Sequence, residues 1–246
     1  MKLFQCTNCK NTVVFENNAC VNCGHLLGYS SYYSKIVSLN STMSKWQLPE
    51  LENKTYVYCK NHQYNVCNWL VDVSRESEFC LACSLNRTIP DILDDDHLEK
   101  WKHIEIAKHR LVYQLLRFRL PVVSKMNNDE NGLCFDFLAK EDLSEEFKDV
   151  KTGHANGVIT LLISEADPVV REQIKKQMSE RYRTLLGHFR HEVGHYYWDR
   201  LIRDNSDLLN NFRNVFGNEL CLIVMHWLIT ITMVHKRTGS KVLLAG

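Results

Sequence analysis

Apolar side chains recur at helical spacing after Pro90. They fall on one face of a stretch that ends near Phe118, at Leu98, Trp101, Ile104, Ile106, Leu111, Leu115 and Leu116. The acidic run Asp94 to Asp96 precedes this face, and negative charge stabilises a helix N-terminus. The pattern predicts a long amphipathic helix. We expect its histidines (His97, His103 and His109) to be surface or hydrogen-bonded residues rather than metal ligands.

A second helical pattern follows Asp167, which can cap a helix with Pro168 at its first position. The run continues through "PVVREQIKKQMSERYRTLLGHFRHEVGHYYWDRLIRD" and is too long and too rich in glycine for one ordinary helix. We therefore place a break near Arg181 to Thr184. The second of the two predicted helices carries His191 and His195.

Between the two helical regions the period changes from that of a helix to that of strands. Apolar and polar residues alternate in "LCFDFLA" and in part of "GVITLLISEAD", and the turn formers "TGHANG" precede the latter. Nearer the N-terminus, residues 28–54 are rich in Ser and Tyr and show no clear period, which is typical of a linker with some packing contacts. Together these patterns predict an α+β protein.

Composition and charge narrow the classes of function. The 246 residues have a net charge of +1, which argues against nucleic acid and an anionic membrane as partners. The apolar run near the C-terminus, "CLIVMHWLITITMV", is shorter than the roughly 20 residues that span a bilayer. The N-terminus has no apolar signal region, so we expect a cytoplasmic protein. Neither the oligomeric state nor the substrate can be read from these features.

Eight of the ten cysteines lie in the first 83 residues, and in a reducing compartment this indicates metal binding. The first group consists of two C-x-x-C pairs with ten residues between them, Cys6, Cys9, Cys20 and Cys23. Four thiolates can hold zinc in a closed, structural site. Gly24 follows the second pair, where a tight turn often needs a positive φ. Redox dithiols or free thiols are the alternative.

The second group is less regular, because the spacing of its first two members does not form a knuckle. Its members are Cys59, Cys67, Cys80 and Cys83. A second four-thiolate zinc site is our prediction, and His62 could replace one cysteine. The alternative is a set of buried cysteines packed beside Trp69 and Leu70.

The sequence His-Glu-x-x-His at 191–195 carries the main candidate chemistry. Residues four apart share a helix face, so His191 and His195 can bind one zinc ion. Glu192 borders that face and can act as general base toward a water molecule. The preceding strand could hold an extended peptide by β-augmentation. The alternative is a pair of helix histidines that only pack.

The segments "TGHANGVITLLISEAD", "YRTLLGHFRHEVGHYYWDRL", "CNWLV" and "CLACSLNRTIPD", with the N-terminal cysteines, resemble bacterial zinc-binding metallopeptidases that carry an N-terminal zinc ribbon. The resemblance covers residues 1–219. It implies a zincin-like domain with His191 and His195 as zinc ligands and Glu192 as catalytic base. It also implies a peptide or protein substrate.

The resemblance stops after "FRNVFGNE". Family members continue with a segment of the type Ala-Leu-x-x-Tyr-Tyr-x-x-Gly-x-x-x-Asp-Trp-Gln and then an acidic helix expected to hold the third zinc ligand. Permitted codons for "MHWLITITMVHKRTGSK", read from the third base of Met225, give such a segment. We therefore expect a frameshift near Glu219 and a missing third ligand, for which His154, His188, His226 or Glu219 could substitute.

The sequence as a whole predicts five regions: a zinc ribbon (1–30), a linker (31–54), a second cysteine-rich zinc module (55–95), an incomplete zincin-like peptidase domain (96–219) and an atypical tail (220–246). One catalytic zinc ion and one or two structural zinc ions are expected. The leading hypothesis is a zinc-dependent metallopeptidase, inactive in this chain if the third ligand is lost. The alternative is a protein- or nucleic-acid-binding module on a non-catalytic scaffold, and a membrane tether is a third.

Overall fold

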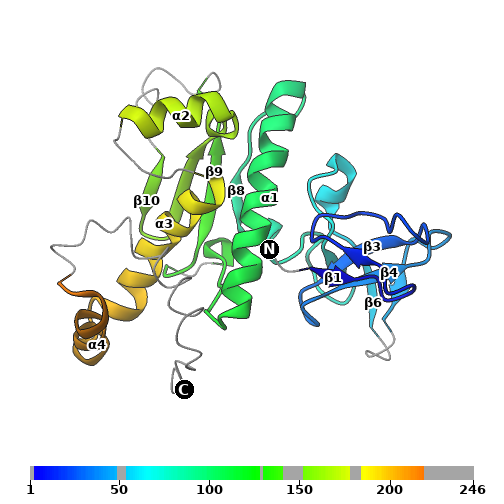
Figure 1. The fold of residues 1–246 in the computed structure, drawn as a ribbon, viewed down its shortest axis with the longest axis horizontal. Coiled ribbons are helices and arrows are strands. Elements are labelled where there is room, and N and C mark those ends of the chain that lie inside the picture. Colours follow the sequence, from blue (N-terminus) through cyan, green and yellow to red (C-terminus); the bar gives the residue numbers. More distant parts are fainter. Residues whose placement is uncertain (1–2, 49–53, 128–129, 141–151, 178–183, 219–246) are drawn as a thin grey trace.

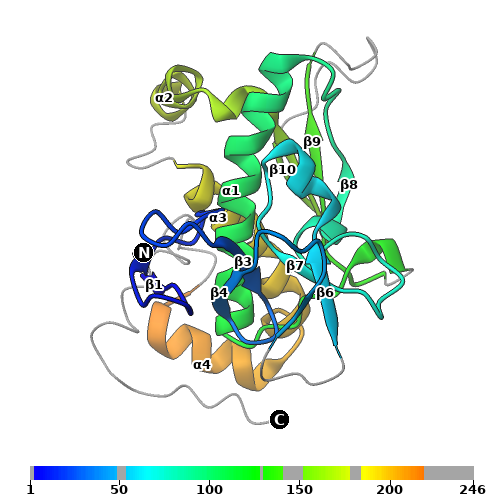
Figure 2. The same cartoon turned by 90° about the vertical axis from the view of Figure 1, so that its right-hand side faces the viewer.

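The computed structural model describes residues 3–48, 54–127, 130–140, 152–177 and 184–218, and it has an α+β fold. The N-terminal part is built from short strands, and the C-terminal part combines a four-stranded sheet with helices. Figure 1 shows these two parts on opposite sides of the long helix α1 (Asp95–Arg117), and Figure 2 shows the N-terminal strands in front of that helix. The α+β prediction is confirmed.

Three small antiparallel sheets form the N-terminal part. Their strands are β1 (Phe4–Gln5) with β2 (Thr12–Val13), β3 (Leu26–Ser30) with β4 (Lys35–Leu39), and β5 (Trp46–Gln47) with β6 (Thr55–Tyr58) and β7 (Leu70–Asp72). Strand β2 lies between the two cysteine pairs of the first group. All of these strands are short, and the cysteines lie in the loops that connect or follow them.

The expectation of an irregular segment over residues 28–54 is wrong for its first half, which forms most of the β3–β4 hairpin. The sequence pattern did not indicate these strands because both of their faces are covered, so apolar and polar residues do not alternate along them. The Tyr29 ring lies 4.5 Å from that of Trp69. On the other side, a Cβ atom at Gly28 would lie 2.6 Å from Leu70 Cδ2, so only glycine lets the strands approach.

The C-terminal sheet has the strand order β10-β11-β9-β8. Its strands are β8 (Asn86–Thr88), β9 (Cys134–Leu138), β10 (Gly153–Ala155) and β11 (Val158–Leu162). The three strands β8, β9 and β11 are parallel, while β10 pairs antiparallel with β11 at the edge. Helix α1 is the crossover between β8 and β9. The strands predicted in "LCFDFLA" and "GVITLLISEAD" are confirmed.

The first two α-helices begin at the acidic run and at Asp167, as predicted. Asp94 accepts hydrogen bonds from two backbone N–H groups at the start of α1, and Asp167 accepts one at the start of α2 (Pro168–Gln177). Thr184 caps α3 (Leu185–Tyr197), at the end of the predicted break. A π-helical turn η6 (Trp198–Ile202) and α4 (Ser206–Phe216) follow. Short 3-10 turns are η1 (Lys60–Tyr64), η2 (Cys83–Leu85), η3 (Lys125–Asn127) and η5 (Ile163–Ala166).

Helices α1 and α3 cover the same face of this sheet. Phe135 and Phe137 are two residues apart on β9 and therefore point to one face. Phe189 of α3 packs edge-on against both rings, with centroids 5.6 and 6.1 Å away. Lys108 of α1 lies over the same two rings. The core thus holds α3, and the motif it carries, against the central strand.

A polar contact also fixes α3 against α1, because Arg190 Nε donates to Gln114 Oε1 at 2.9 Å. Within the described ranges, none of the helices has the length and apolar character required to cross a membrane. The apolar run at 221–234 and the rest of the predicted tail lie outside the described residues.

Candidate metal centres and catalytic site

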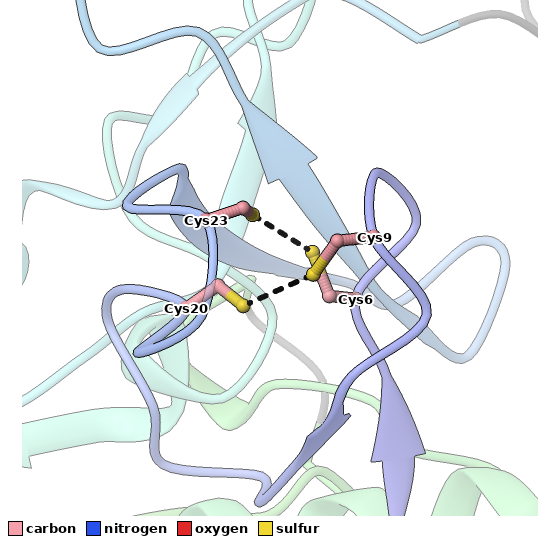
Figure 3. Close-up of side chains that lie close together, drawn as sticks. All are labelled: Cys6, Cys9, Cys20 and Cys23. Carbon is pink, nitrogen blue, oxygen red and sulfur yellow. Dashed lines mark hydrogen bonds between the residues drawn. The ribbon is translucent and has the colours of Figure 1, made fainter.

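The four cysteines of the first group converge from two loops (Figure 3). The sulfur atoms of Cys6 and Cys23 are 3.7 Å apart, and those of Cys9 and Cys20 are 3.6 Å apart. Two sulfurs bound tetrahedrally to zinc at 2.3 Å lie about 3.8 Å from each other. The donor atoms and their separations therefore fit a four-thiolate zinc ion.

Each pair sits on a tight knuckle that requires a left-handed residue. Lys10 N–H donates to the carbonyl of Cys6, and Gly24 N–H donates to that of Cys20, both at 2.9 Å. The φ angles of Lys10 and Gly24 are 63° and 70°, so the positive φ predicted at Gly24 is confirmed. The two knuckles have the same geometry although only one of them contains glycine.

The thiols of this group differ in acidity. The backbone N–H of His25 and the side-chain amide of Asn8 stabilise the Cys23 thiolate and lower its pKa to about 6. Burial raises the pKa of Cys6 to about 11. Without a metal, Cys23 is therefore mainly a thiolate and Cys6 a protonated thiol at neutral pH.

The second cysteine group is also assembled, and it is buried throughout. Its four sulfurs lie within 4.8 Å of one another, from Cys59, Cys67, Cys80 and Cys83. The Cys67 and Cys80 sulfurs are 3.7 Å apart, which again fits zinc. Backbone N–H groups of Trp69, Cys80 and Cys83 each donate to a sulfur of the group at 3.3–3.4 Å.

His62 does not join this group. Its ring stacks on Tyr58 with centroids 3.8 Å apart, and Nδ1 lies 2.8 Å from the carbonyl oxygen of Cys67. A carbonyl only accepts, so Nδ1 carries the proton. The irregular spacing between Cys59 and Cys67 is accommodated by the turn η1, which brings both sulfurs to the site without a histidine.

Sequence reasoning missed the side chains that α1 adds to the second group. His109 Nε2 lies 3.6 Å and Glu105 Oε2 lies 3.9 Å from the Cys83 sulfur. The fully buried Lys108 donates to Glu105 Oε1 at 2.8 Å and also to Asn86 Oδ1. Burial alone would lower the pKa of His109, but the Cys83 sulfur and the Glu105 carboxylate raise it on balance. Helix α1 therefore adds a carboxylate, an ammonium group and an imidazole next to the sulfur atoms of the second cysteine group.

The two motif histidines point to the same place from consecutive turns of α3. The Nε2 atoms of His191 and His195 are 3.2 Å apart. Two imidazole nitrogens bound tetrahedrally to one zinc ion at 2.0–2.1 Å are separated by about 3.3–3.4 Å. The pair therefore fits a zinc ion through Nε2 of both rings.

Glu192 is buried next to this pair and is hydrogen-bonded to His188. His188 Nε2 lies 3.1 Å from Glu192 Oε1, and His188 Nδ1 lies 2.9 Å from Glu165 Oε2. Burial would raise the pKa of Glu192, but the hydrogen bond and charge of His188, with the charges of His191 and His195, lower it on balance. Glu192 is therefore ionised at neutral pH, as a general base must be.

The possible substitutes for a third ligand are not placed to act as one. His154 lies parallel to His195 with ring centroids 6.4 Å apart, and its Nε2 accepts a hydrogen bond from the Gly157 N–H at 2.9 Å. His188 uses both ring nitrogens on carboxylates. His226 and Glu219 lie outside the described residues. Within the described ranges, no His, Cys, Asp or Glu completes a three-ligand group with the motif pair.

The fold and these sites define a class of protein. Residues 97–221 match the family described as "Putative zinc-binding metallo-peptidase", and residues 3–94 match a zinc-ribbon domain. The chain belongs to this zinc-binding metallopeptidase family. A single ribbon match spans both cysteine groups and the strands between them.

Curated relatives also match the chain over most of its length. The chain is 38% identical over 218 residues to uncharacterized proteins of Mycobacterium bovis and Mycobacterium tuberculosis. The match covers 89% of this chain and 59% of theirs, so the chain spans about three fifths of their length. No solved structure shows significant similarity to it.

Proposed function

We propose that this chain contributes to a zinc-dependent metallopeptidase, with His191 and His195 as two ligands of the catalytic zinc ion and Glu192 as general base. The observation that carries the proposal is the 3.2 Å separation of the two Nε2 atoms, next to a buried and ionised Glu192. Two histidines that only pack would have no need of a neighbouring buried carboxylate. Membership of the family supports a peptide or protein substrate.

The proposed reaction is hydrolysis of a peptide bond. A bound zinc ion supplies a Lewis acid that polarises the carbonyl and lowers the pKa of a water molecule to about 7. Glu192 accepts the proton of that water as its oxygen bonds to the peptide carbon. The same carboxyl then delivers the proton to the leaving nitrogen, so the C–N bond breaks and an acid and an amine result.

The sheet edge near α3 supports binding of an extended peptide. Strand β10 lies at the edge of the sheet, and its central residue, His154, lies next to the ring of His195. An edge strand offers backbone N–H and C=O groups that can pair with a substrate strand. The peptide would then run antiparallel or parallel to β10, with its carbonyl near the histidine pair.

A third zinc ligand is proposed to come from beyond the described residues. The motif pair needs one more protein ligand for a typical catalytic site. The curated relatives extend over more residues than this chain matches, which leaves room for such a ligand. A frameshift near Glu219 remains our explanation for the atypical tail, and the nucleotide sequence at that codon tests it.

The two cysteine groups are proposed to bind one structural zinc ion each. Each offers four sulfurs with tetrahedral spacing and therefore leaves no coordination position for a substrate. A reducing compartment such as the cytoplasm is proposed with these sites, because there C-x-x-C pairs bind metal rather than form disulfides.

The test compares the wild type with a version that has the restored reading frame, and the two substitutions, Glu192→Gln and His191→Ala, are made in the frame-restored version. Zinc content is measured by mass spectrometry of the metal, and cleavage by mass spectrometry of a broad peptide library. We expect the frame-restored protein to bind one zinc ion more than His191→Ala and to cleave peptides. The variant Glu192→Gln should retain the zinc and lose cleavage by at least about 100-fold.

His103→Gln is the matched control, because His103 is an exposed histidine of α1 outside the site. If the frame-restored protein holds no more zinc than His191→Ala and cleaves nothing, the peptidase proposal is wrong. If Glu192→Gln cleaves as fast as the unsubstituted protein, the assignment of the base is wrong.

A further inference from the structure

We propose that His188, held by Glu165, is a positioning residue that orients the carboxylate of Glu192 toward the metal-binding pair. This inference rests on the proposed function, in which Glu192 is the base. Its evidence is a chain of three buried side chains from η5 through α3. The relative exposures are 2% for Glu165, 9% for His188 and 7% for Glu192.

Helix geometry brings two members of this chain together. His188 and Glu192 are four residues apart on α3, so they share a face. The distance from His188 Nε2 to Glu192 Oε1 is 3.1 Å. This contact uses one oxygen of the carboxylate and leaves Oε2 for another partner. The base is thus held by one oxygen while the other remains to accept a proton.

Proton accounting determines the role of the imidazole. An ionised carboxylate can only accept hydrogen bonds, and His188 contacts one carboxylate with each ring nitrogen. When both carboxylates are ionised, both ring nitrogens donate to them, so His188 bridges Glu165 and Glu192. Such charge-assisted hydrogen bonds are about twice as strong as neutral ones.

Glu165 is itself anchored to the sheet. Thr152 Oγ1 donates to Glu165 Oε1 at 2.6 Å and accepts from the N–H of Leu162 at 3.2 Å. Arg171 donates to the backbone oxygen of Glu165 at 2.6 Å. The anchor thus reaches the last residue of β11, so the orientation of Glu192 is tied to the sheet whose edge strand lies beside His195.

Rigid support of this kind is what a general base requires. A misplacement of about 1 Å can cost on the order of 100-fold in rate. A glutamate has three rotatable side-chain bonds, and burial alone does not choose among their rotamers. Residues that lock such a side chain through hydrogen bonds keep it within the productive geometry.

The first measurement is independent of catalysis. Nitrogen-15 NMR of the ring in the full chain, loaded with zinc, should show two N–H protons on His188. The change Glu192→Gln should shift the signal of the Nε2 proton, and Glu165→Gln that of the Nδ1 proton. Glu172→Gln is the control, since Glu172 is an exposed α2 residue paired with Lys175.

The second measurement is kinetic and uses a peptide that the frame-restored protein cleaves. Removal of both donors in His188→Ala should lower kcat by about 10–100-fold at unchanged zinc content and KM. His188→Gln keeps one donor and should recover part of that loss. A merely structural role would lower zinc content or thermal stability in step with kcat, and would not separate the two variants.

The outcomes distinguish this inference from the proposed function. A ring that carries one proton, or ring signals that Glu192→Gln leaves unchanged, overturns the positioning role whether or not peptides are cleaved. Absence of cleavage with both N–H signals present overturns the peptidase proposal and supports the hydrogen-bonded arrangement. Cleavage with equal kcat in the wild type and His188→Ala overturns the positioning role alone.

Discussion

The imidazole Nε2 of His109 lies 3.6 Å from the sulfur of Cys83, so α1 directly contacts the second cysteine group. His109 Nδ1 lies 2.6 Å from the carbonyl oxygen of Glu105, one turn earlier, which accepts its proton and fixes the ring. The contact joins the N-terminal part to α1, the helix that covers the C-terminal sheet. Outer contacts of this kind orient metal ligands and tune their affinity.

We predict that His109→Ala weakens zinc binding at the second cysteine group by about 10–100-fold, the usual cost of losing such a partner. Native mass spectrometry after a timed challenge with a chelator measures the zinc ions retained. His103→Ala is the control, because His103 lies on the same helix and is exposed. Equal retention in both variants would show that the His109–Cys83 contact does not support the metal.

Cys80→Ser should lose one zinc ion per chain and melt at a lower temperature than the wild type. Cys80 contributes a sulfur and a backbone donor to the second group, and zinc affinity in such modules is folding free energy. Cys134→Ser is the matched control, because Cys134 is buried in β9 outside both groups. A zinc count unchanged by Cys80→Ser would exclude the proposed ligand.

The metal-free protein should show pH-dependent alkylation at Cys23. Its pKa of about 6 means that the thiolate is present above pH 6 and is lost as the pH falls through that value. Iodoacetamide labelling at pH 5, 6 and 7, followed by peptide mass spectrometry, measures this. Cys6, with a pKa of about 11, serves as the slow internal control. Zinc should protect both, and equal rates for both in the metal-free protein would contradict the prediction.

Phe189→Ala should destabilise the protein by about 3–5 kcal/mol, the usual cost of removing a buried aromatic ring. Phe189 is fully buried and packs edge-on against Phe135 and Phe137. Denaturant unfolding at fixed zinc measures the change. Val169→Ala is the control, because the side chain is 64% exposed and its loss should cost within about 0.5 kcal/mol. A loss below 1 kcal/mol for Phe189→Ala would show that α3 does not depend on this contact.

Local signals predicted much of the candidate site. Cysteine spacing indicated the two cysteine groups, and the acidic run at Asp94 and the cap at Asp167 located the starts of α1 and α2. The helical spacing of His191 and His195 predicted their convergence, because four residues make one turn. Each of these features depends on residues close in the sequence.

The features that were missed depend on contacts between distant segments. Glu165 reaches His188 across 23 positions, and Cys83 reaches His109 across 26, without any motif that links them. The β3–β4 hairpin was missed for the related reason that Trp69 and Leu70 cover its two faces. The sequence offered His188 only as a possible third zinc ligand, although its spacing of four residues from Glu192 places both on one face of α3.

The order of these elements along the chain also bears on how the protein folds during synthesis. All eight cysteines of the two groups lie within the first 83 residues, while β11 ends at Leu162. Domains generally fold as units, the N-terminal one first, during synthesis. We therefore expect the N-terminal part to emerge from the ribosome, fold and bind zinc while the strands that hold α3 are still untranslated. Helix α1 would then pack against the folded N-terminal part through His109, and the rest of the protein would fold against α1.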